Sequence, residues 1–201
     1  MTIKTALCLA LIFSTSTVSA QSVETANMVS ATPAVARDES GISSCGINFM
    51  VTSLVDGAPA VLYDFSMNIY SSYMGLVKVG SHNVRYRGKN SGWDLDNMKI
   101  RLPAPKSFWI ATRDDRVSIR PDKYFPAESK GFVIGAAEIE KVMELLQATA
   151  SGEPIQVSTE YAGDRIHRVT GFRANMSQDD RDTVQACFDG ILKRMKNEVP
   201  K

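Results

Sequence analysis

Residues 46–69, GINFMVTSLVDGAPAVLYDFSMNI, alternate between apolar and polar side chains on both sides of an Asp-Gly pair. Ile47, Phe49 and Val51 share one face before the pair, and the odd positions from 61 to 69 are all apolar after it. Side chains alternate between the two faces of a strand, so this pattern predicts two strands, each with one buried face. An Asp-Gly pair between such strands is typical of a β-hairpin.

Similar but shorter segments continue along the chain. Glycines and prolines separate strand-like segments at 76–79, 83–87, 98–102, 108–112 and 116–120. Apolar residues recur at helical spacing over 136–148 and 177–196, and a second predicted hairpin over 155–172 lies between them. Strands joined by short turns indicate antiparallel pairing, with the helices packed on one side. The predicted fold class is therefore α+β, with a mostly antiparallel, sandwich-like β-sheet and two helices packed on it.

Residues 1–20 have the three parts of a secretory signal peptide. Lys4 supplies the positive charge, residues 6–13 are apolar, and the small residues that end in Ala20 predict cleavage after that position. The apolar run is too short to cross a bilayer and no later run is longer, so we expect no transmembrane segment after cleavage. The mature protein is therefore predicted to be periplasmic or secreted.

The residues after the signal peptide are expected to be unstructured at first. Residues 21–43 contain mostly small and polar side chains, no aromatic residue and no sustained period. This composition predicts a flexible leader. The remaining residues, 44–201, are enough for one domain with a substantial core. We therefore expect a single α+β domain over 44–201.

Cysteine usage fits an exported protein. Cys8 leaves with the signal peptide, so Cys45 and Cys187 remain, and two cysteines in an oxidising compartment predict one disulfide. Cys187 also lies on the apolar side of the predicted last helix. The bond would close most of the domain into one loop, and the lower entropy of the unfolded chain would then stabilise the folded protein by roughly 4–5 kcal/mol. Two free buried thiols or a redox pair are the alternatives, and no CxxC motif supports the latter.

The C-terminal half carries a recognisable order of elements. A predicted helix over 138–152 ends in Ser-Gly, a hairpin begins at 155–161, and residues 172–187 lead into a helix with a cysteine in its middle. This order is similar to that of invasion-associated locus B-like proteins and related secretion-accessory proteins of the bacterial periplasm. The resemblance implies a β-rich periplasmic domain without a known active site. The N-terminal half lacks the additional cysteine pairs expected from the first of these families.

Charge and motif content exclude several classes of function. The formal net charge is +1, and loss of Lys4 with the signal peptide brings it to zero, which disfavours a nucleic-acid partner. No glycine-rich phosphate loop is present, and we expect no cofactor. Only two histidines occur, and neither has the neighbours that a metal site needs, so we expect no metal.

Two groups of residues are candidates for a site. Ser81 and His82 lie in a Gly-Ser-His-Asn segment predicted to be a turn, and with Asp64 they have the residue types of a hydrolytic triad. Such a triad depends on geometry that a sequence does not supply. The second group consists of cations in the predicted strands 83–87 and 98–102: Arg85, Arg87, Lys99 and Arg101. If the two strands are neighbours, these cations form a basic strip for an anionic partner, or a solvated sheet edge.

The leading hypothesis is an exported, non-catalytic envelope protein that binds a partner, such as a secretion-accessory, invasion-associated or immunity-type protein. The partner would be another envelope or secreted protein, or an anionic envelope polymer. The alternative is a small periplasmic hydrolase that acts on cell-wall or lipid substrates through Ser81, His82 and Asp64. A structural envelope component without a discrete ligand is a third possibility.

Overall fold

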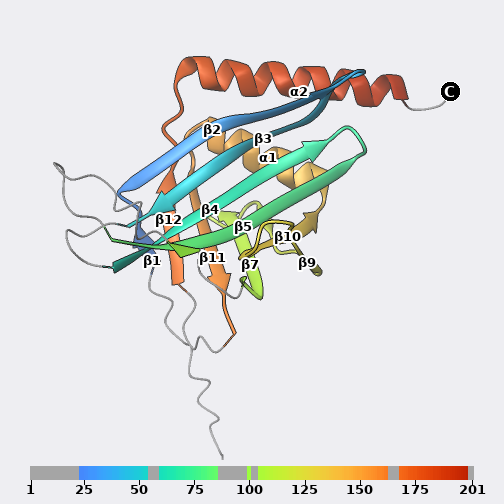
Figure 1. Cartoon of the computed structure of the whole chain (residues 1–201). Helices are drawn as coiled ribbons and strands as arrows, with labels where there is room; N and C mark the ends of the chain where they lie inside the picture. The colour runs from blue at the N-terminus through green and yellow to red at the C-terminus, as the bar shows by residue number, and fades with distance from the viewer. Residues whose placement is uncertain (1–22, 54–58, 86–98, 101–103, 163–167, 199–201) are drawn as a thin grey trace, which may run out of the picture.

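The computed structural model describes residues 23–53, 59–85, 99–100, 104–162 and 168–198 (Figure 1). In chain order, the elements of this part of the chain are β1 (Val23–Thr25), β2 (Met28–Asp38), β3 (Gly41–Thr52), β4 (Pro59–Tyr70), β5 (Met74–Arg85), β6 (Lys99–Ile100), β7 (Ser107–Thr112), β8 (Ser118–Ile119), β9 (Tyr124–Pro126), β10 (Phe132–Ala137), α1 (Ile139–Ala150), β11 (Pro154–Glu160), β12 (Arg168–Arg173) and α2 (Gln178–Glu198). Neither helix is long and apolar enough to cross a membrane.

The strands form two sheets. A seven-stranded sheet has the order β2-β3-β4-β5-β10-β9, with β6 also paired to β5, and a five-stranded sheet has the order β1-β12-β11-β7-β8. Every pairing between described strands is antiparallel except that of β1 with β12. The predicted central hairpin is confirmed, since β3 pairs with β4 from Ser44 opposite Tyr70 to Val51 opposite Tyr63. The α+β, sandwich-like fold class is therefore confirmed.

The core lies on one face of the seven-stranded sheet. The odd-numbered residues 47–51 of β3 and 63–69 of β4 are buried there, as their alternation predicts. Phe49 and Phe65 stack with their ring centroids 4.6 Å apart, and both rings meet the edge of Phe172 from the five-stranded sheet at 5.9 Å. Figure 1 shows the five-stranded sheet and α1 on this same side of the seven-stranded sheet. We call this the inner face, and the opposite side the outer face.

A disulfide joins α2 to the sheet. Cys45 and Cys187 are bonded, with their Cα atoms 5.8 Å apart and their positions 142 apart in sequence, so the predicted bond is confirmed. Two further contacts hold the helix: the Tyr73 hydroxyl donates to the backbone oxygen of Met195 at 2.6 Å, and Arg194 pairs with Asp38 at 2.8 Å. The covalent bond and these contacts fix α2 beside the β2–β3 and β4–β5 turns.

The predicted flexible leader is wrong for residues 23–38. These residues form β1 and β2, and β2 pairs with β3 along its whole length, from Met28 opposite Thr52 to Asp38 opposite Gly41. β2 is an edge strand whose side chains are exposed or half-buried. On its inner side Val29 and Ala31 are half-buried and pack against the core, whereas Ser30 and Thr32 are exposed, so the alternation is present but short and made mostly of small side chains. The ordered domain starts before residue 44.

Two further predictions about the strands are wrong. The sequence predicts separate strands at 76–79 and 83–87, but residues 76–79 and 83–85 belong to one strand, β5, which runs through Gly80 and His82, and residues 86 and 87 lie outside the described residues. Residues 132–137, partly assigned to a helix, form β10 between β5 and β9. Glycine marks a turn in many strands, but Gly80 lies in mid-strand because the ring of Phe132 occupies the space where a Cβ would be.

Candidate functional site

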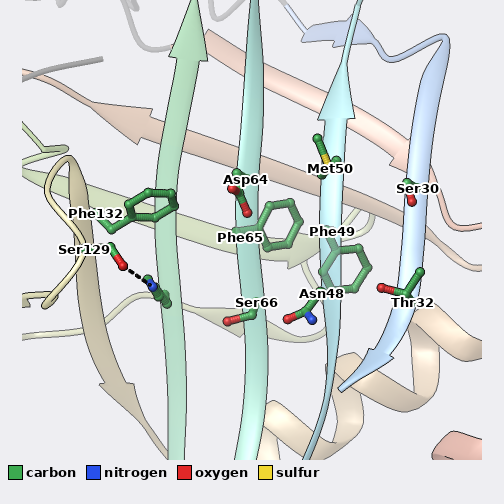
Figure 2. Close-up of a pocket in the computed structure, with 11 residues that line it drawn as sticks. Ser30, Thr32, Asn48, Phe49, Met50, Asp64, Phe65, Ser66, Ser129 and Phe132 are labelled. Atoms are coloured by element: carbon green, nitrogen blue, oxygen red, sulfur yellow. Dashed lines mark hydrogen bonds between the residues drawn. The ribbon is translucent and has the colours of Figure 1, made fainter. Parts of the chain in front are cut away.

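Two rows of mostly polar side chains cross the outer face of the seven-stranded sheet (Figure 2). They come from even-numbered positions of β2, β3, β4 and β5, because the odd positions of β3 and β4 point into the core. The cross-strand register aligns them: one row is Thr32, Asn48, Ser66 and Lys78, and the other is Ser30, Met50 and Asp64.

These rows line a shallow hollow of about 440 Å³. Ser129 and Phe132 close one side of it (Figure 2). Lys78 donates a hydrogen bond to the Ser129 hydroxyl at 3.2 Å, and its Nζ lies 4.8 Å from the centroid of the Phe132 ring. Met50, which lies between Ser30 and Asp64 in one of the rows, is 40 % exposed. The site is therefore an open surface with short hydrogen-bonding groups, one cation, one carboxylate and one exposed thioether.

Beside this hollow, His82 contacts Asp64 as the hydrolase hypothesis requires. His82 Nε2 lies 3.2 Å from Asp64 Oδ2, and the His82 residue is only 7 % exposed. The Phe132 ring meets the imidazole edge-on, with 6.0 Å between centroids. Among the described residues, no group forms a hydrogen bond with His82 Nδ1. The prediction that His82 lies in a turn is wrong, since the residue is in β5 opposite Leu62.

Ser81 does not join this pair. Neighbouring residues of a strand point to opposite faces, so Ser81 faces inward while His82 faces outward. The Ser81 hydroxyl is fully buried and forms a short hydrogen bond with the Tyr161 hydroxyl. The three residues of the predicted triad are therefore divided between two sides of one sheet, and Ser81 is out of reach as a nucleophile activated by His82.

The predicted basic strip is described only in part. β5 and β6 are neighbours, with Asn83 opposite Lys99, so the two strands that carry the strip lie side by side as expected. Arg85 is the last residue of β5 and Lys99 is the first residue of β6, but only their backbone placement is described, and Arg87 and Arg101 lie outside the described residues. The strip therefore stays a prediction.

Metal ligands are not gathered in the part of the chain that the structure describes: it contains no group of three or more His, Cys, Asp or Glu residues suited to an ion. The polar rows of the outer face were not singled out from the sequence. The signal was present in the even positions of residues 46–69, which carry Asn, Asp and Ser between the buried apolar residues.

Comparison with known proteins adds no relative. No protein-family model, no curated protein sequence and no solved structure matches this chain. The resemblance of the C-terminal half to periplasmic secretion-accessory proteins therefore stays a prediction that rests on its order of elements.

Proposed function

We propose that this chain is an exported, non-catalytic protein that binds another protein through the outer face of its seven-stranded sheet. The observation that carries the proposal is the hollow on this face, in which exposed Met50 lies among short polar side chains. A sheet that covers a core on one side offers its other side as a broad surface for recognition.

Exposed apolar side chains on this face favour a protein partner. Phe125 on β9 is 52 % exposed, and the register places it opposite Ile134, which lies opposite Lys78 of the first polar row. Phe125 and Met50 thus lie on the same side of the sheet. Methionine and aromatic residues are enriched in protein interfaces, and short hydroxyl and amide side chains supply hydrogen bonds around them.

The balance of charges in the hollow also favours a protein partner. Lys78 and Asp64 are the charged residues among its lining, so their charges balance. An anionic polymer would favour an excess of cations, and of the four cations predicted to supply one, the described residues include only Arg85 at the end of β5 and Lys99 at the start of β6. The described outer face therefore supports a protein partner over an anionic envelope polymer.

The hydrolase alternative receives less support. His82 and Asp64 form a pair, but Ser81 points to the opposite face and is hydrogen-bonded to Tyr161. A base without a nucleophile within hydrogen-bond reach does not make a covalent catalyst. Export is supported by the disulfide, because such bonds persist in oxidising compartments.

An affinity capture from envelope extract tests the proposal. The wild-type protein is compared with a double variant of the outer face, Met50→Lys with Ser66→Arg, which adds charge and bulk to the hollow. The matched control carries Gln147→Lys with Ala186→Arg on exposed positions of the two helices.

We expect the wild type and the control to retain a stoichiometric protein partner, and the outer-face variant to bind it at least tenfold more weakly. Equal binding by the outer-face variant would place the interface elsewhere, and no protein bound to the wild type would refute the proposal. Cell fractionation with N-terminal sequencing tests export separately, and the mature chain should start at Gln21.

A further inference from the structure

β2 is a long edge strand. It has 11 residues and ends the seven-stranded sheet (Figure 1), whereas β9, β1 and β8, which end the two sheets elsewhere, have 3, 3 and 2 residues. Among the described strands, none pairs with the far side of β2. Very short edge strands avoid pairing with other chains, and β2 lacks this protection.

The backbone of β2 presents hydrogen-bonding groups along this edge. In an antiparallel sheet, the backbone groups of alternate residues point to opposite neighbours. The Ser71 N–H donates to the Ser43 carbonyl at 3.0 Å, so odd residues of β3 face β4 and even residues face β2. Even residues of β2 lie opposite these even residues, and Pro33, which has no N–H, falls on the odd side. The N–H and C=O groups that point away from the sheet belong to Val29, Ala31 and Val35.

The edge also lacks charged side chains. Residues 28–36 contain none, although lysine and other charged residues commonly guard exposed edges. Pro33 hinders pairing in this stretch, but it removes only one donor. A second copy that paired through the same edge would bring a second proline and lose two hydrogen bonds, whereas a different strand would lose one. The edge therefore favours a strand from another protein.

This edge is continuous with the hollow on the outer face. Ser30 and Thr32 line the hollow from β2, and both are exposed (Figure 2). On the inner side of the strand, Val29 and Ala31 are half-buried against the core and Val35 is 38 % exposed. A strand added to β2 would therefore have polar neighbours on its outer side and apolar neighbours on its inner side.

We infer that the protein partner adds an extended, uncharged segment to β2 as a further strand of the seven-stranded sheet. Its hydroxyl or amide side chains lie on the outer side, beside Ser30 and Thr32, and its apolar side chains lie on the inner side. Main-chain hydrogen bonds give such strand addition its affinity, and the alternate side chains give it specificity. This inference rests on the proposed function, since one partner covers both the hollow and the edge.

Amide hydrogen exchange followed by NMR tests the inference, first on the free protein and then on its complex with the captured partner. In the free protein, the amides of Ala31 and Val35 should exchange at least tenfold faster than those of Thr32 and Ala34, which are bonded to β3. The partner should slow the exchange of Ala31 and Val35 at least tenfold. Slow exchange of these two amides in the free protein would overturn the inference, and a dependence on protein concentration would identify a second copy as the occupant.

The variant Ala31→Pro removes one outward N–H, and Pro33 shows that proline is accommodated on this side of the strand. The matched control, Ala31→Ser, keeps the N–H and nearly the same size. We expect Ala31→Pro to bind the purified partner at least tenfold more weakly, and the control to bind it like the wild type. Circular dichroism checks that both variants fold; if Ala31→Pro does not, the exchange of the wild-type complex decides.

Three results would overturn the inference and leave the interface at the hollow in place. They are full binding by Ala31→Pro, equal loss of binding in the two variants, and a bound partner that does not slow the exchange of Ala31 and Val35. Capture of no partner by the wild type would instead refute the proposed function, and the inference with it.

Discussion

Reduction of the Cys45–Cys187 disulfide is expected to remove a large part of the stability of the protein. The bonded residues are 142 positions apart, and for a loop of this size the chain-entropy relation gives about 5 kcal/mol. The total free energy of unfolding of a domain is about 5–15 kcal/mol. At a urea m-value of about 2 kcal/mol/M, the unfolding midpoint should fall by roughly 2.5 M. Urea unfolding of the oxidised and the reduced protein, followed by circular dichroism, measures this shift.

Reduction leaves both side chains in place, so the comparison reports on the bond and not on lost packing. The variant Cys45→Ala with Cys187→Ala is the control: it should unfold near the reduced midpoint and should not respond to reductant. In the oxidised full-length chain, a thiol assay should detect only Cys8. If the oxidised and reduced proteins unfold at the same urea concentration, the closed loop contributes nothing and the reasoning is refuted.

Three further predictions concern the sheet and its contact with α2. Gly46→Ala should destabilise the protein by about 1–3 kcal/mol in urea unfolding, because its Cβ would lie 2.0 Å from the backbone oxygen of Met67; an unchanged midpoint would contradict this close packing. Ser81→Ala should lower the free energy of unfolding by about 1–2 kcal/mol, because a buried hydrogen bond to Tyr161 is lost. Thermal unfolding measures this loss, and a melting temperature equal to that of the wild type would show that the bond contributes little. The hydrogen bond from Arg194 holds the pKa of Asp38 below its usual value, so Asp38 contributes stability above its unfolded pKa of about 4 and loses it as the pH falls through the lower folded pKa. Asp38→Asn should therefore be less stable than the wild type at pH 7 and equally stable in acid, whereas a gap independent of pH would exclude the ion pair as its cause.

The central hairpin and the last helix were predictable because burial imposes a period on their sequences. β3 and β4 bury every second residue, and α2 buries Val184, Cys187, Phe188 and Ile191 at helical spacing. β2 was missed for the opposite reason. As an edge strand it buries no side chain fully, and its alternation is limited to a few mostly small residues, while its backbone hydrogen bonds to β3 make little demand on side-chain type.

The error at Gly80 shows how tertiary packing changes the meaning of a residue. In the sequence, Gly80 precedes Ser81 and His82 and indicates a turn. In the structure it accommodates the ring of Phe132 from β10, a strand that follows some fifty residues later. Only the pairing of β5 with β10 explains why glycine is needed there. The division of Ser81 from His82 follows from the same fact, since a turn allows adjacent side chains to converge and a strand does not.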